Sequence, residues 1–131
     1  MRLPDWQSRL DAYIASARGR AYSPGEFDCC TACADVVYAV TGVDLMSDLR
    51  GTYNTDCGAY KLIRRLGGMS ALLSSRLGPE IDPRIALPGD IGVGGDDGES
   101  AVFCLGSTWA SVGSSGLTIV RPPKMAWRCH G

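Results

Sequence analysis

An aspartate and a cysteine, Asp28 and Cys29, stand directly before a run of residues with helical character. A cysteine in the first turn of a helix lies at the positive end of the helix dipole, which favours the thiolate, the nucleophilic form. Asp28 suits the N-cap position because its carboxylate can accept hydrogen bonds from the free amides of that turn. The pair therefore indicates the start of a cysteine-hydrolase site with Cys29 as nucleophile.

The base that such a site needs has no obvious source in the sequence. The chain has one histidine, His130, which is next to last. A cysteine hydrolase uses an imidazole both to hold the thiolate and to protonate the leaving amine, and general acid–base catalysis contributes about 10²–10⁴ in rate. Because residues near a terminus are usually mobile, we expect His130 to take no part, and amide hydrolysis to be weak or absent.

The six cysteines leave other chemistries open. Cys30 and Cys33 form a C-x-x-C pair, which is typical of thioredoxin-like redox sites, but no strand–helix–strand pattern precedes them. The same pair could join Cys57, and Cys104 or Cys129, in a four-thiolate site for zinc or an iron–sulfur cluster. A strong zinc signal has a second C-x-x-C pair, which this sequence lacks. The pattern therefore favours reduced, mostly buried thiols over a metal centre, and no cofactor is expected.

Length and composition predict one globular domain over residues 1–131. The net charge is −1 and no long basic run exists, so nucleic acid is not expected as the main partner. No stretch approaches the roughly 20 apolar residues that span a bilayer. The N-terminal residues lack the apolar core of a signal peptide, so we expect synthesis in the cytoplasm, where thiols stay reduced.

Apolar periodicity and turn signals predict a helical first half, over about residues 1–78. The basic residues Lys61, Arg64 and Arg65 recur at helical spacing and are interpreted as a solvated helix face. The expected helices span residues 5–18, 29–40, 55–66 and 70–77.

The composition changes in the second half, over about residues 88–128, where glycine, serine and β-branched residues dominate. Short alternating segments between glycine-rich turns predict an antiparallel sheet of about four to six strands. Helices followed by strands indicate an α+β fold, with N-terminal helices packed on a C-terminal sheet. The expected strands span residues 90–93, 100–105, 108–112, 117–120 and 126–128.

The tryptophans are candidates for a contact surface, since aromatic residues are favoured at protein interfaces. Trp6 fits the apolar face of the first helix and is expected in the core. Trp109 and Trp127 lie on the glycine-rich late segments, so we expect them to contact a neighbouring protein.

Several segments, taken in order, resemble NlpC-type cell-wall peptidases, a branch of the papain-like fold. The matching segments are Asp28 and Cys29 at a helix start, PGDI at residues 88–91 and AVFCLG at residues 101–106. Over nearly its full length the chain resembles a set of small phage tail proteins related to that fold. The segments that carry this second resemblance are LPDW at residues 3–6, FDCC at 27–30, YAVTG at 38–42 and RGTY at 50–53.

The resemblance implies a papain-like fold in which Cys29 occupies the nucleophile position and Asp28 the position before it. The histidine that begins the second sheet strand in the peptidases falls at Ser100, and a serine hydroxyl cannot serve as that base. The resemblance therefore implies a degenerate peptidase kept as a structural part of a phage tail tip or baseplate hub. The expected location is the virion, and the expected partners are other tail-tip proteins.

Two other functions remain open at this point. One is an active cysteine peptidase or amidase that cleaves host peptidoglycan, with Cys29 as nucleophile and His130 or a group from a neighbouring chain as base. The other is a hub protein that binds zinc or an iron–sulfur cluster through its cysteines.

Overall fold

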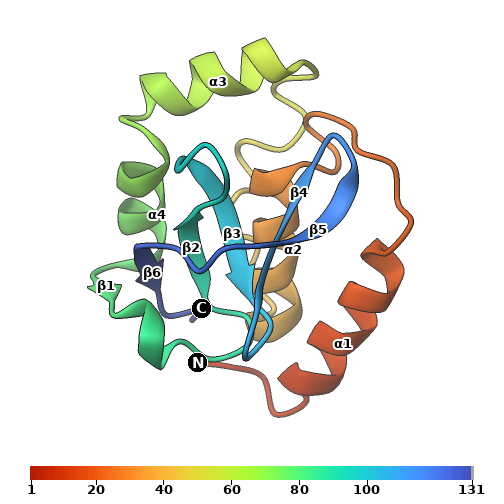
Figure 1. Ribbon diagram of the computed structural model, residues 1–131, viewed down its shortest axis with the longest axis vertical. Coiled ribbons are helices and arrows are strands. Elements are labelled where there is room, and N and C mark those ends of the chain that lie inside the picture. Colours follow the sequence, from red (N-terminus) through yellow and green to blue (C-terminus); the bar gives the residue numbers. More distant parts are fainter. Residues whose placement is uncertain (131) are drawn as a thin grey trace.

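The computed structural model describes residues 1–130. Its first part is helical and its second part is a single sheet, and the helices pack on that sheet (Figure 1). The α-helices are α1 (Trp6–Ala17), α2 (Cys29–Thr41), α3 (Asp56–Arg65) and α4 (Met69–Leu77), followed by a short 3-10 helix, η1 (Pro83–Ile85). Every predicted α-helix is confirmed, with its ends within two residues of those expected.

Helix α2 is the central helix of the fold, and most of its residues are buried. It packs on α1 and on strands β3 (Ser100–Cys104) and β4 (Trp109–Gly113). The sequence sets both ends of this helix. Asp28 caps the N-terminus, and Gly42 adopts a left-handed φ of 80° at the C-terminus, where its N–H bonds the Tyr38 carbonyl.

The sheet has six strands in the order β1-β6-β2-β3-β4-β5, and every neighbouring pair is antiparallel. Strands β2 to β5 form the predicted meander, whereas β6 returns to pair with β2 on its other side. The sequence analysis missed the two-residue β1, which exists only through its pairing with β6. The remaining strands are β1 (Glu80–Ile81), β2 (Ile91–Gly94), β5 (Gly116–Val120) and β6 (Met125–Trp127).

The face of the sheet away from the helices is partly covered by the chain itself. The segment between β5 and β6 crosses this face (Figure 1), and Pro123 packs directly on β2. A Cβ atom at Gly92 would lie 2.6 Å from the Pro123 ring, so only glycine permits this close approach.

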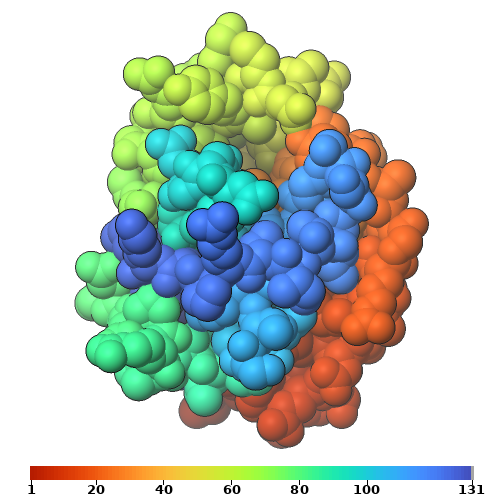
Figure 2. Space-filling view, in the orientation of Figure 1, coloured from red at the N-terminus to blue at the C-terminus, as the bar shows by residue number. Residues whose placement is uncertain are grey.

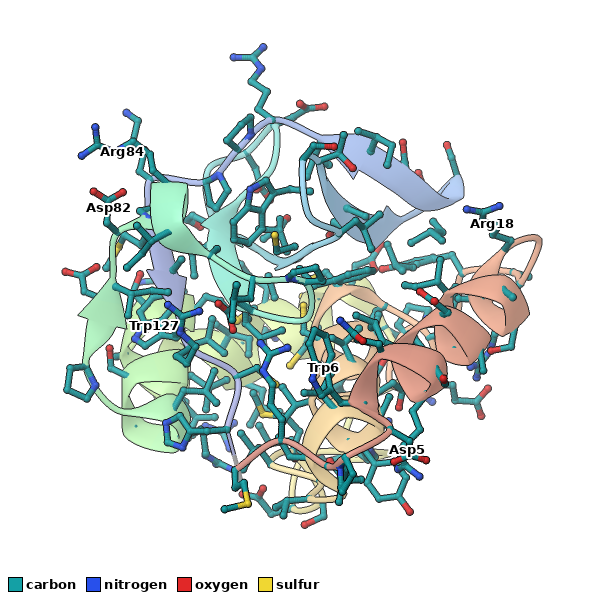
Figure 3. The ribbon with its side chains drawn as sticks, turned by 90° about the horizontal axis from the view of Figure 1, so that it is seen from below. Asp5, Trp6, Arg18, Asp82, Arg84 and Trp127 are labelled. Carbon is teal, nitrogen blue, oxygen red and sulfur yellow. The ribbon has the colours of Figure 1, made fainter. Side chains whose placement is uncertain are left out.

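The prediction that Trp109 and Trp127 face a neighbouring protein is wrong, because both are buried within the chain. Trp127 is 0% exposed and lies beside α4 (Figure 3), where its indole N–H donates to the Ser74 hydroxyl at 3.2 Å. Trp109 is 5% exposed and packs on the outer face of the sheet with Val102 and Cys104. Sequence position alone could not indicate this covering, which comes from segments distant along the chain.

Asp90, at the start of β2, joins the two ends of the described chain. Its carboxylate is fully buried and contacts the guanidinium groups of Arg2 at 2.7 Å and Arg128 at 3.0 Å. It also accepts hydrogen bonds from the amides of Leu87 and Cys129, each at 2.8 Å. The Gly89–Asp90 step therefore has a structural role at the end of the molecule where both termini lie (Figure 1).

None of the described helices combines the length and the apolar character that a membrane crossing requires.

Candidate functional site

The candidate site is a cleft of about 720 Å³ at the N-terminal end of α2. Helix α3 forms one wall, and the turn between β2 and β3 together with the end of β4 forms the opposite wall. Figure 2 shows a recess between the surface of α3 and the turns of the sheet. Cys29 and Ser100, the two positions that the sequence analysis connected, both line this cleft.

Asp28 fixes the start of α2 through a capping box. Its carboxylate accepts the Thr31 amide at 2.8 Å, while the Thr31 hydroxyl accepts the Asp28 amide at 2.8 Å. The second carboxylate oxygen accepts the Gly25 amide at 2.8 Å and the Tyr53 hydroxyl at 2.6 Å. The predicted N-cap is therefore confirmed, and Asp28 also ties two loops to the helix.

Tyr53, in the RGTY segment, is anchored within the chain by its hydrogen bond to Asp28. The Arg50 guanidinium bonds Asp35 at 2.6 Å and Asp44 at 2.7 Å, which anchors the loop that carries Tyr53. Burial, and then the hydrogen bond to Asp28, raise the pKa of the Tyr53 hydroxyl, so it stays protonated as a donor. The sequence could not reveal this role of Tyr53, because its partner Asp28 lies 25 residues away along the chain.

Cys29 is partly exposed to the cleft, but its thiol is not activated. Burial first, and then the negative charges of Asp28 and Asp97, raise the pKa of Cys29 to about 11. A hydrogen bond from the backbone of Ala101 acts in the opposite direction without overcoming these effects. The expectation that the helix dipole favours the thiolate is therefore wrong, because desolvation and nearby carboxylates outweigh the dipole. Cys29 is a neutral thiol at pH 7.

Ser100 begins β3 next to Ala101, whose backbone bonds the Cys29 thiol. The Ser100 hydroxyl donates to the carboxylate of Asp97, with oxygen–oxygen distances of 3.0 and 3.1 Å. Ser100, the position that the resemblance assigns to the base, thus lies in the cleft with Cys29. Its hydroxyl is hydrogen-bonded to the Asp97 carboxylate. Asp97 is a residue that sequence reasoning missed, and its place in a glycine-rich turn gave no signal.

His130 is not part of the cleft. It is exposed, and its Nε2 lies 2.8 Å from the carbonyl oxygen of Leu77, at the C-terminal end of α4. The residues that line the cleft within the described chain include no histidine. The candidate site therefore holds a nucleophile position without an imidazole base.

The four-thiolate site that the sequence left open is not formed by the described residues. Within residues 1–130, no group of three or more histidine, cysteine, aspartate or glutamate side chains is arranged to hold a metal ion. Cys30 and Cys33 are buried in the core, Cys57 is exposed on α3, and Cys104 packs on the outer face of the sheet. Cys129 is buried in the core. Burial raises the pKa of Cys30 and of Cys129 to about 12, so both are neutral thiols that pack as small apolar groups.

Carboxylates outnumber cations in the lining of the cleft, where the one basic side chain among the described residues is Arg64. A negative surrounding of this kind disfavours a thiolate and favours positively charged or neutral groups. The arrangement therefore gives Cys29 no imidazole that could take its proton and stabilise the resulting thiolate. The acidic residues that line the cleft are Asp28, Asp56, Asp97 and Glu99.

Comparisons with known proteins give one match. No curated protein and no solved structure matches the chain. A family model described as a domain of unknown function, DUF6950, matches residues 1–129, so the chain belongs to the DUF6950 family.

Proposed function

We propose that this chain is a structural component of a phage tail tip or baseplate hub, built on a papain-like fold whose hydrolytic site is degenerate. The observation that carries the proposal is the pairing of Cys29 with Ser100 in one cleft, with His130 bonded elsewhere. The resemblance to small phage tail proteins supports the virion as location and other tail-tip proteins as partners.

The state of the thiol supports a non-catalytic role. A pKa of about 11 leaves only about one part in 10⁴ of Cys29 as thiolate at pH 7. The Ser100 hydroxyl cannot accept and return a proton as an imidazole does. The α2 N-terminus, the capping box and the meander nevertheless keep the framework that would present a nucleophile.

Genetic complementation of the phage that encodes this chain tests the structural role. Deletion of the gene is expected to give particles with defective tail tips, and Cys29→Ala is expected to restore them as well as the natural chain does. Val36→Asp is the matched negative control, because Val36 is 0% exposed and an aspartate there prevents folding. Infectious particles that lack the chain would contradict the proposal.

An active cysteine peptidase or amidase that cleaves peptidoglycan is the second candidate. The observation that favours it is the partial exposure of Cys29 in an open cleft beside the backbone of Ala101. A zymogram on purified peptidoglycan, with the natural chain and Cys29→Ala side by side, separates the two candidates. No clearing by either protein is expected, and clearing that depends on Cys29 would establish the enzyme instead.

A further inference from the structure

Helix α3, one wall of the cleft, makes few contacts with the rest of the described chain. It lies across the N-terminal end of α2, at the end of the molecule opposite the termini (Figure 1). None of its residues is buried, whereas α2 is buried along most of its length. Asp56, Tyr60 and Arg64 of α3 line the cleft that contains Cys29.

Two consecutive glycines follow the C-terminal end of α3. Gly67 and Gly68 follow each other with φ angles of 95° and 99°, a region that residues with side chains rarely adopt. These two residues separate α3 from α4, which has four buried residues and packs on β6. A rotation at this pair, with a compensating change at residues 54–55, would move α3 while α4 and the anchored Tyr53 stay in place.

Few contacts hold α3 in its position. Leu62 and Ile63 are partly buried against the core. Within residues 1–130, one side-chain hydrogen bond joins α3 to another part of the molecule, from the Tyr22 hydroxyl to the Asp56 carboxylate. Elements with few buried apolar groups and exposed hydrogen bonds are those that open locally at low free-energy cost.

Opposite charges face each other across the cleft. Arg64 lies on the α3 wall, and Asp97 and Glu99 lie on the opposite wall. In the described chain no ion pair joins them. Asp56, also on the α3 wall, repels the same two carboxylates, so the charges across the cleft do not by themselves hold it closed.

We propose that α3 is a lid that moves about Gly67 and Gly68 to open and close the cleft over Cys29, with the Tyr22–Asp56 hydrogen bond as its latch. The lid is independent of the proposed tail-tip role, since it concerns access to the cleft in the isolated chain.

The alkylation rate of each cysteine by iodoacetamide, measured by mass spectrometry of the folded chain, tests the lid. Cys57 is exposed on α3 and reports reagent activity, whereas Cys33 is 2% exposed and reports global unfolding. Tyr22→Phe removes the latch and keeps the ring. Cys29 is expected to react about two- to tenfold faster in this variant, with Cys57 and Cys33 unchanged.

Tyr60→Phe is the matched control. The Tyr60 hydroxyl accepts a hydrogen bond from Arg64 of the same helix, so its loss leaves the latch intact and the Cys29 rate unchanged.

Three outcomes would overturn the lid. The first is an unchanged Cys29 rate in Tyr22→Phe, and the second is an equal acceleration of Cys33, which would show destabilisation of the whole fold. The third is a shifted pH midpoint of the Cys29 rate without a higher plateau, which would show a changed thiol and not a changed access.

Discussion

Two buried carboxylates, at opposite ends of the molecule, are held in different ways. Asp90 contacts two guanidinium groups, those of Arg2 and Arg128, in addition to two amides. Asp28 has no ion pair within the described chain and is bonded only by neutral donors, two amides and the Tyr53 hydroxyl. The two arginines therefore neutralise the buried charge of Asp90, whereas the charge of Asp28 is not neutralised and gives the cleft a negative potential.

This difference accounts for the state of Cys29. The uncompensated charge of Asp28 adds to desolvation and keeps the thiol neutral. In a catalytic site, the base that takes the thiol proton becomes a cation beside the sulfur and stabilises the thiolate. The cleft end of this chain instead uses its aspartate to join loops to a helix.

The largest effect is expected from removal of the compensated charge. Asp90→Ala leaves Arg2 and Arg128 without their partner and two amides without an acceptor, so the free energy of unfolding should fall by about 3–5 kcal/mol. Urea denaturation followed by circular dichroism measures it. Asp82→Ala is the control, because Asp82 and its partner Arg84 project from the surface (Figure 3), where solvent screens an ion pair, and its loss of stability should be much smaller. Equal losses in the two variants would contradict the structural role of Asp90.

Removal of the uncompensated charge should cost less. Asp28→Ala deletes the helix cap and the acceptor of Gly25 and Tyr53, which predicts a loss of about 2–3 kcal/mol in the same assay. Because Asp28 raises the pKa of Cys29, that pKa should fall in the variant. A loss of stability larger than that of Asp90→Ala would reverse the comparison.

Ser100→His places an imidazole in the cleft with Cys29 and gives the sulfur a cationic neighbour. Below about pH 6.5, where the imidazole is protonated, its opposite charge favours the thiolate, so Cys29 should be alkylated about ten- to a hundredfold faster at pH 6 than in the natural chain. The pH dependence of the Cys29 alkylation rate measures this increase. Thr118→His, on the exposed part of β5, is the control and should leave the rate profile unchanged. An identical profile in both variants would show that position 100 does not face the sulfur.

Tyr53→Phe makes the smallest change at the cleft end. It removes one hydrogen bond to Asp28 and keeps the ring, so the free energy of unfolding should fall by about 1 kcal/mol. Tyr38→Phe is the control, because Tyr38 is 51% exposed and its hydroxyl lies at the surface. The prediction fails if both variants unfold at the same urea concentration as the natural chain.

Local signals in the sequence were sufficient for the helices and for most strands. Asp28 and Gly42 set the ends of α2 through capping and a left-handed turn, which depend on nearby residues alone. Strand β1 could not be predicted, because a two-residue strand has no periodicity and forms only by pairing with β6. Burial of Trp109 and Trp127 was missed for the same reason, since distant segments cover them.

The candidate site was predictable in its positions but not in its chemistry. The order of the motifs placed Cys29 and Ser100 together, and both line one cleft. The pKa of Cys29 depends on burial and on Asp97, which comes from a turn far along the chain. The helix dipole alone lowers the pKa of Cys29, whereas the segments that bury the thiol and bring Asp97 close raise it.

Because β6 lies inside the sheet, between β1 and β2, the sheet cannot be completed before this late segment is made. This strand, at residues 125–127, pairs between β1 and β2, although it comes last among the described strands along the chain. Until β6 is made, one edge of β2 is unpaired. A fragment that stops before Met125 exposes this edge, which can pair with a strand of another chain. During translation the sheet therefore closes only after nearly all of the described residues have left the ribosome.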